Sequence, residues 1–167
     1  MFVFYFAAAR HFSGGGPMPA SIARLQRVLL MSLAIAFAGG AGAADIGQIK
    51  VAKGQVTIER SGQALPAEVG ARIQPADVLK TGADGSVGIT MSDNSLLSAG
   101  PNSVLVLDRY EFDSTTSQGH FDASLQKGSL AVISGRIAKQ SPDAMKVRTP
   151  TSILGVRGTE FVVSVND

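Results

Sequence analysis

The stretch TPTSILGVRGTEFVVSV, residues 149–165, decides how the rest of this chain is interpreted. Its apolar side chains alternate with polar ones, which is typical of a half-buried β-strand. Two glycines, Gly155 and Gly158, interrupt the alternation, and Arg157 lies between them. Glycine inside a strand indicates a bend or the close approach of another backbone. The stretch therefore predicts β-structure that is broken at its glycines and carries a charge at the break.

Arg157 has two possible environments. It can be solvated, or it can be partly buried, with its donors shared between backbone carbonyls and a carboxylate such as Glu160. We favour the second environment, because a structural arginine beside a glycine-relieved turn explains both the charge and the glycines. Under this interpretation the motif is structural rather than catalytic.

From Asp45 onward, short alternating runs are separated by glycines, with no long apolar stretch at helical spacing. This pattern predicts an all-β protein. We expect turns at residues 82–85, 92–95, 100–102 and 118–119, where Gly, Asn, Asp, Ser and Pro cluster. We expect strands near residues 47–52, 55–60, 77–81, 86–92, 95–98, 104–110, 121–126, 129–136, 145–148 and 153–165.

One short element recurs, a glycine followed by apolar residues at the second and fourth positions. It occurs as GQVTI from Gly54, GSVGI from Gly85 and GSLAV from Gly128, and GTEFVV from Gly158 is shifted by one residue. The recurrence indicates coils of one architecture, with residues 108–120 as a polar insertion. Residues 103–107 and 130–133 are continuous apolar runs, typical of strands covered on both faces. We therefore expect one domain, either β-solenoid-like or a rolled two-layer sheet.

Residues 18–44 have the order of a secretory signal peptide, which we expect to form a helix before the β-domain. Arg24 and Arg27 precede an uncharged apolar run at 28–38, and a tail of small residues follows. A run of 11 residues is short for a membrane span, which needs about 20 apolar residues. An uncleaved anchor helix is the alternative.

Cleavage is expected just after Ala43 or Ala44, where the tail has an Ala-x-Ala pattern. Translation is expected to start at Met18, so residues 1–17 are interpreted as a gene-model extension or an atypical n-region. The chain contains no cysteine, which excludes a lipid-anchored leader. The exported domain is then residues 45–167, located in the periplasm or secreted.

The exported domain has none of the basic character of the whole chain. Removal of residues 1–44 takes away three arginines and no acid, leaving 12 basic and 13 acidic residues. Six of the ten aromatic residues leave as well, and Tyr110, Phe112, Phe121 and Phe161 remain. Nucleic-acid binding needs a basic face and usually stacking rings, so we expect no nucleic-acid partner.

Catalytic and metal-binding patterns are scarce. His120 is the one histidine of the exported domain, and no G-x-S-x-G elbow is present. Without a second histidine, a thiolate or a calcium-loop pattern, no metal site is expected. Spacing along a sequence does not decide whether two carboxylates meet across strands, so a glycosidase pair stays open. The chain lacks the tryptophans on which sugars often stack. We expect no catalytic residues, no cofactor and no enzymatic activity.

The motifs from Ile49 to Val165 resemble the FecR-domain family. The resemblance is carried by GQVTIERSGQALPAEVGARI, DVLKTGADGSVGITMSDNSLLSAGPNSVLVL, KGSLAVISGRI and VRTPTSILGVRGTEFVV. It implies an extracytoplasmic all-β domain, of the kind found in bacterial surface-signalling regulators, and no catalytic residues. Ala76 and Asn94 stand where the family commonly has glycine. The fold-marking positions that the resemblance transfers are Thr149, Pro150, Thr151, Gly155, Arg157, Gly158, Thr159 and Phe161.

The expected function is that of a non-enzymatic, exported protein-interaction module with a link to cell-envelope or surface signalling. Regulators of the family also carry a cytoplasmic anti-sigma segment and a membrane helix, which residues 1–44 do not supply. An envelope or outer-membrane protein is the expected partner, because an open sheet edge can take up a partner's strand. No permanent membrane span is expected if the leader is cleaved. The alternative is a module that binds cell-wall or exopolysaccharide glycans, with residues 108–120 as its polar surface.

Overall fold

The computed structural model describes residues 44–156 and 160–165. The signal peptide and the gene-model extension predicted above, and the predicted environment of Arg157, lie outside these ranges. None of the helices in the described ranges has the length and apolar content that a membrane span requires.

The described residues are mainly β-strands, so the all-β prediction is confirmed. The strands are β1 (Gly47–Lys53), β2 (Val56–Arg60), β3 (Gln63–Pro66), β4 (Arg72–Ile73), β5 (Val78–Thr81), β6 (Ser86–Met91), β7 (Leu96–Ala99), β8 (Val104–Phe112), β9 (Gly119–Ile133), β10 (Met145–Arg148), β11 (Ile153–Gly155) and β12 (Glu160–Val165). The short helix α2 (Arg136–Gln140) and the 3₁₀ turn η1 (Pro142–Ala144) join β9 to β10.

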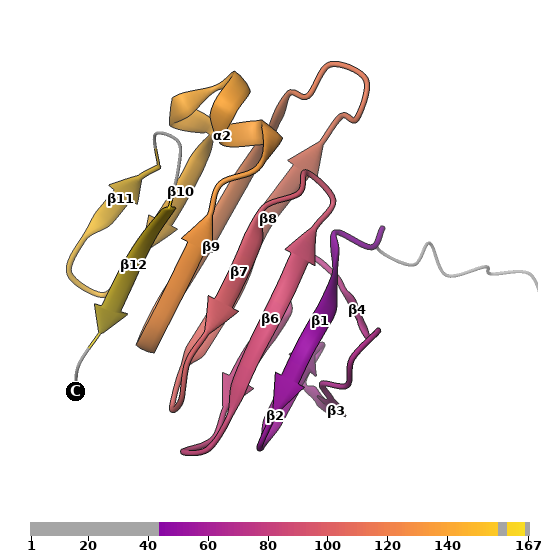
Figure 1. The fold of residues 1–167 in the computed structure, drawn as a ribbon, viewed down its shortest axis with the longest axis vertical. Coiled ribbons are helices and arrows are strands. Elements are labelled where there is room, and N and C mark those ends of the chain that lie inside the picture. The colour runs from indigo at the N-terminus through magenta and orange to yellow at the C-terminus, as the bar shows by residue number, and fades with distance from the viewer. Residues whose placement is uncertain (1–43, 157–159, 166–167) are drawn as a thin grey trace, which may run out of the picture. The chain divides into compact units, whose positions relative to one another are not determined.

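One continuous sheet curls into two layers (Figure 1). The front layer has the strand order β12-β9-β7-β6-β1-β4, and the back layer has the order β3-β2-β5-β8-β9-β10-β11. Within the described ranges, parallel pairing occurs only between β9 and β10. Stacked coils of a solenoid would pair in parallel throughout, so the solenoid-like alternative is not confirmed. The pairing is that of the rolled sheet.

Strand β9 belongs to both layers. Its first half pairs with β8 and β10, and its second half pairs with β7 and β12. Gly128 lies at the transition with φ +85°, and a Cβ there would come within 2.2 Å of the Ser103 Oγ. The two strands predicted at 121–126 and 129–136 are therefore one strand, because glycine lets it change layers without a break. The second prediction ran too far, since α2 begins at Arg136.

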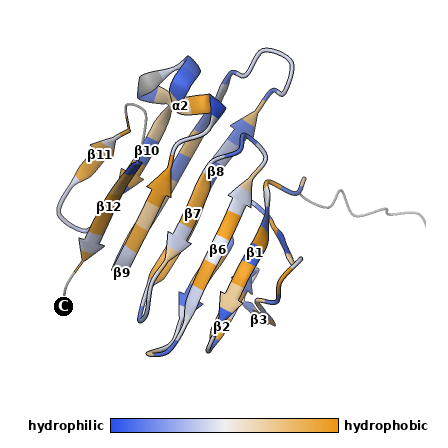
Figure 2. Cartoon of the chain, in the orientation of Figure 1, coloured by the Kyte–Doolittle hydropathy of each residue, from blue (hydrophilic) through white to orange (hydrophobic). Residues whose placement is uncertain are grey.

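The core lies between the two layers, and the alternation along each strand builds it. Strand β6 buries Val87, Ile89 and Met91 on one side and leaves the residues between them half exposed. Figure 2 shows the same alternation of apolar and polar residues along β6. From the back layer, Tyr110 and Phe121 meet edge to face with ring centroids 5.7 Å apart. Apolar burial of this kind, at about 25 cal/mol per Å², is the main support of a fold without disulfides.

Asp93 is a fully buried carboxylate that connects three parts of the chain. Its carboxylate accepts hydrogen bonds from the Tyr110 hydroxyl at 3.2 Å, the Ser95 hydroxyl at 2.7 Å and the Ile137 amide at 3.3 Å. These donors lie in β8, in the turn before β7 and in α2. The Ser95 hydroxyl also accepts the Gly135 amide at 2.9 Å. Burial, together with the nearby Asp93 charge, raises the pKa of Tyr110 well above its usual range. The network holds α2 against the end of the sheet.

A second buried carboxylate, Asp77, pairs with Arg60. The Arg60 Nε and a terminal nitrogen donate to its two oxygens at 2.8 and 2.7 Å, and the Gln74 amide donates at 2.8 Å. Asp77 is fully buried, whereas the Arg60 side chain is 27% exposed. A terminal nitrogen of Arg60 also donates to the Arg72 carbonyl at 2.9 Å. The pair thus connects β2, the start of β5 and the short strand β4.

The predicted polar insertion at 108–120 is largely sheet. Strand β8 continues to Phe112 and β9 begins at Gly119, so that residues 113–118 alone form the connecting turn. The strands extend further into these residues than the sequence predicted, because polar residues on an exposed hairpin lack the apolar signal of a buried strand.

The two positions where glycine was expected both have left-handed backbone. Ala76 has φ +66° and Asn94 has φ +67°. Asparagine tolerates this conformation, whereas a left-handed alanine costs roughly 1–2 kcal/mol. Part of this cost is offset because alanine restricts the unfolded chain more than glycine does. Ala76→Gly is therefore expected to raise the free energy of unfolding by about 0.5–1 kcal/mol in urea titrations.

The matched control for this change is Ala83→Gly, at an exposed turn position whose φ is not positive. It is expected to lower the stability slightly, because only the unfolded chain gains freedom. Equal effects of the two substitutions would contradict the strain at Ala76.

Candidate protein-interaction edge

The two open sides of the curled sheet differ in how their edges are protected. On one side β3 has four residues and ends in Pro66, and β4 has only two residues. Very short strands and proline are the usual protection of sheet edges against further pairing. On the other side the edges are β11 and β12. Strand β12 has six residues, EFVVSV, with no proline and one charge, at its first position.

Within the described ranges, β12 pairs with β9 alone, from Glu160 opposite Ile133 to Val165 opposite Gly128. Its other side therefore presents unpaired backbone N–H and C=O groups, the template for one more strand. Phe161, Val163 and Val165 face inward and pack against the core while remaining half exposed. The outward-facing Val162 is 68% exposed.

The back layer ends at β11, which the turn at residues 149–152 joins to β10. In this turn the Thr149 hydroxyl accepts the Ser152 amide at 3.0 Å, and the Thr149 amide donates to the Ser152 carbonyl at 2.8 Å. These bonds close the reversal that brings β11 back beside β10. Ile153 is 68% exposed and Leu154 is also exposed.

A groove of about 430 Å³ separates this turn and β11 from the end of β12. Its lining combines apolar and hydroxyl-bearing side chains: Gln126, Thr149, Pro150, Thr151, Ser152, Leu154, Val163, Ser164 and Val165. An unpaired strand edge thus lies directly beside a groove that has room for side chains. We refer to β12 together with this groove as the C-terminal edge.

A row of uncharged residues crosses the outer face of the front layer, starting at the C-terminal edge. Successive pairings place Val162, Ala131, Ser98, Gly88 and Val51 in one row across five strands. The outer face of the back layer carries the Glu59–Lys80 ion pair. Exposed apolar side chains flank the C-terminal edge on both layers, Val162 on β12 and Ile153 and Leu154 on β11.

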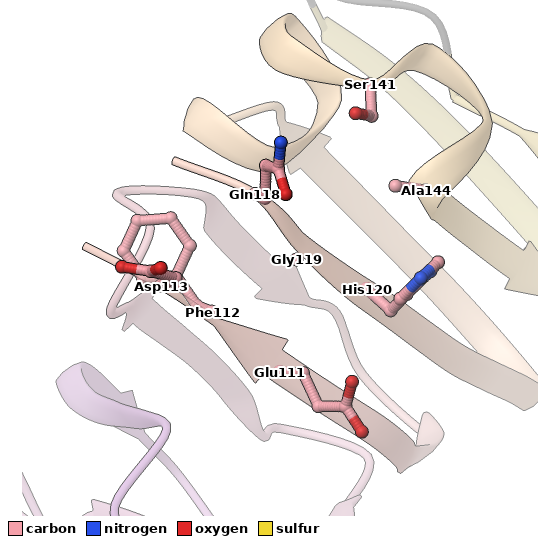
Figure 3. A pocket seen from close by; sticks show the side chains of 8 residues that line it. All are labelled: Glu111, Phe112, Asp113, Gln118, Gly119, His120, Ser141 and Ala144. Atoms are coloured by element: carbon pink, nitrogen blue, oxygen red, sulfur yellow. The ribbon is translucent and has the colours of Figure 1, made fainter. Parts of the chain in front are cut away.

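A second groove, of about 500 Å³, lies near the hairpin of β8 and β9 and the end of α2 (Figure 3). His120 lies opposite Glu111 on the paired strands β9 and β8, and its side chain is exposed. Glu111 accepts two hydrogen bonds at 3.0 Å from a terminal nitrogen of Arg109. Asp113 caps the turn, and the Thr115 and Thr116 amides lower its pKa. Both carboxylates therefore have local structural partners, and the described residues supply no hydrogen bond to the His120 imidazole.

The fold-marking residues have different positions relative to the C-terminal edge. Thr149, Pro150 and Thr151 line its groove, and Phe161 lies in β12. Gly155 ends β11, where a Cβ would meet nothing within 4 Å, so the close approach predicted for the glycines is not found there. Arg157, Gly158 and Thr159 lie outside the described residues. Glu160, the predicted partner of Arg157, is exposed.

Analysis of the sequence missed the groove and the unequal protection of the two sides. One signal was present: Pro66 marks a protected edge, and the last strand has no such residue. Nothing in the sequence, however, indicates that β11 and β12 end different layers.

The comparisons with known proteins point to one family. Residues 77–167 match the family described as FecR protein. No curated protein and no solved structure matches the chain. The match begins at the buried Asp77, although β1 to β4 belong to the same curled sheet. Because the match spans more than half of the 167 residues and includes the C-terminal edge, the chain belongs to the FecR family.

Proposed function

We propose that this protein is an exported, non-enzymatic module that binds an envelope protein by accepting one of its strands along β12. The observation that carries the proposal is the unprotected edge of β12 beside a groove, opposite a side whose edges are protected. FecR proteins are known for envelope signalling, which makes an envelope partner the natural class.

The geometry suits recognition by strand addition. An added strand gains backbone hydrogen bonds irrespective of its sequence, and pockets beside it select alternate side chains. Along β12 the backbone groups are supplied by the free side of the strand, and the groove lies under Val163 and Val165. Affinity and specificity would thus come from adjacent parts of one surface.

Export is compatible with this fold because the predicted cleavage site precedes the sheet. Ile46 is the first buried residue after it, and the Ile46 amide donates to the Ile73 carbonyl at 2.8 Å. Among the described residues, β1 and the buried residues all lie after Ala43 and Ala44. The location in the periplasm or outside the cell is part of the proposal.

The second groove does not favour catalysis or glycan binding. Its carboxylates bind Arg109 and the turn amides, and the Phe112 ring is covered by the Arg136 guanidinium at 4.6 Å from the ring centre. A sugar would need that ring face for stacking. The C-terminal edge is therefore preferred as the functional surface, and no cofactor is required.

Val163→Lys tests the proposal. In the free protein the lysine can reach water from its half-exposed position, whereas an added strand would cover its charge. We expect at least about tenfold lower recovery of an envelope protein in affinity purification from an envelope fraction, since 1.4 kcal/mol already gives that factor. Val165→Lys, at the second inward position of the groove, is expected to act in the same way.

The matched control is Val69→Lys, the same substitution at a residue that is 65% exposed and distant in sequence from β12. It is expected to leave recovery unchanged. Circular dichroism establishes that all variants fold. Recovery of the same partner by wild type, by Val163→Lys and by Val165→Lys would refute strand addition at β12.

A further inference from the structure

We propose that a second copy of this chain can occupy the C-terminal edge, with the two β12 strands pairing antiparallel about Val163. The inference rests on the proposed function, because it uses the same free strand edge. It differs in the occupant, a second copy in place of an envelope strand, and it specifies the register. Three features of β12 support the dimer: its pleat, the position of the groove beside it and the distribution of its charges.

The pleat limits the possible registers. Phe161, Val163 and Val165 face inward, and an added strand must keep inward residues opposite inward ones, because a shift by one residue inverts every side chain. The two-fold axis that relates two antiparallel β12 strands must therefore pass at a residue, which then lies opposite its own copy, and not between two residues. The registers that pair most of the strand are centred on Val162 or on Val163.

The groove selects the register centred on Val163. In that register Phe161 of each copy lies opposite Val165 of the other, and Val163 lies opposite its own copy. Because Val163, Ser164 and Val165 line the groove, the largest inward side chain of one copy is placed at the groove of the other. Centring on Val162 would leave Val165 outside the ladder and place the charged Glu160 within it.

The charges agree with this choice. All five positions of the ladder centred on Val163, residues 161–165, are uncharged. The single charge of β12, on Glu160, lies beyond this ladder. No like charges are therefore opposed. The front layers of the two copies would join into one sheet whose outer face continues through Val162 and Ala131.

The assembly would close as a dimer. An isologous contact uses the same patch on both copies, so the pairing consumes both β12 edges. The opposite side of the sheet ends in β3 with Pro66 and in the two-residue β4, which do not offer a comparable edge.

The absence of cysteine from the chain allows a direct test by single-cysteine cross-linking of the full protein. Directly opposed residues have Cα atoms about 4.5–5.5 Å apart, within the range of a disulfide. Diagonal neighbours, at about 7–8 Å, are outside it. Val163→Cys is therefore expected to form covalent dimers under mild oxidation. Lys146→Cys, an exposed position on β10, is the collision control and is expected to stay monomeric.

Two further variants determine the register. In the proposed register Val162 of one copy lies opposite Ser164 of the other. Val162→Cys and Ser164→Cys are each expected to stay monomeric when oxidised alone and to cross-link when the two proteins are mixed. Both positions are exposed, so this readout holds even if a cysteine at position 163 disturbs the fold. Cross-linking of Val162→Cys alone would overturn the proposed register.

The dimer and the proposed function can fail separately. If wild type is monomeric in light scattering and the position 162 and 164 variants do not cross-link when mixed, the dimer is refuted. If wild type, but not Val163→Lys, still recovers an envelope protein in that case, the proposed function stands. If the mixed variants cross-link but envelope recovery is insensitive to Val163→Lys, the dimer is supported and the proposed function is refuted.

Discussion

Asp93→Ala is expected to lower the free energy of unfolding by about 3–5 kcal/mol, because it leaves several buried donors without an acceptor. The carboxylate is fully buried and accepts hydrogen bonds from Tyr110, from Ser95 and from the amide of Ile137. Each buried group that loses its partner costs about 1–3 kcal/mol, and water has little access to the site. In a domain of this size the melting temperature is expected to fall by more than about 10 °C.

The loss of stability should be greatest at α2, because the hydrogen bonds of Asp93 attach this helix to the turn before β7. Hydrogen exchange is therefore expected to show faster exchange at residues 135–140 in a variant that still folds. Asp143→Ala, at an exposed carboxylate of η1, is the matched control and is expected to change the melting temperature by only a few degrees. Equal effects of the two alanines would contradict the structural role of Asp93.

Arg60→Met is expected to destabilise the protein by about 3–5 kcal/mol, because breaking a buried pair from one side leaves an uncompensated charge. Asp77 is fully buried and loses two of its three hydrogen bonds in this variant. Arg60 itself is 27% exposed, so water can partly replace it, and the lower end of the range is expected. Denaturant titration measures the change.

Two comparisons make this result specific. Arg148→Met, at an exposed arginine of β10, removes the same side chain without orphaning a carboxylate and is expected to be nearly neutral. The double variant with Asp77→Leu should recover part of the loss, because no buried charge remains. A double variant as unstable as Arg60→Met would show that packing rather than charge burial dominates at this site.

The strands were predicted correctly where apolar and polar residues alternate clearly. They were missed where a segment is a strand only because its backbone pairs with a neighbouring strand. β6 and β8 bury alternate residues, and both were predicted within two residues at each end. β3 and β4 were missed, since QALP and RI have no alternation of their own and are strands only because β2 and β1 pair with them. α2 was missed because five residues are too few to show a helical period.

The recurrent glycine element has a physical basis other than coils. Gly54 and Gly85 lie in adjacent turns, where a Cβ on Gly54 would come within 2.3 Å of the Asp84 carbonyl oxygen. A Cβ on Gly85 would come equally close to the Gln55 carbonyl oxygen. Gly128 is needed instead where β9 changes layers. The pattern was interpreted as coils, whereas in the structure it marks positions of close approach and gives no information on the direction in which the strands pair.

The sequence by itself determined which side of each strong strand faces the core, because this depends on local alternation alone. It also determined the all-β class and the resemblance to the FecR family. Only the tertiary structure decided which strands end the two layers and that a groove lies beside β12. Edge position depends on pairing between residues far apart in the chain, as between β12 and the second half of β9. A strand at the edge of a sheet has the same local sequence pattern as a strand that is paired on both sides. The pattern of side chains depends on which face of the strand is buried and not on whether its backbone edge is hydrogen-bonded to another strand.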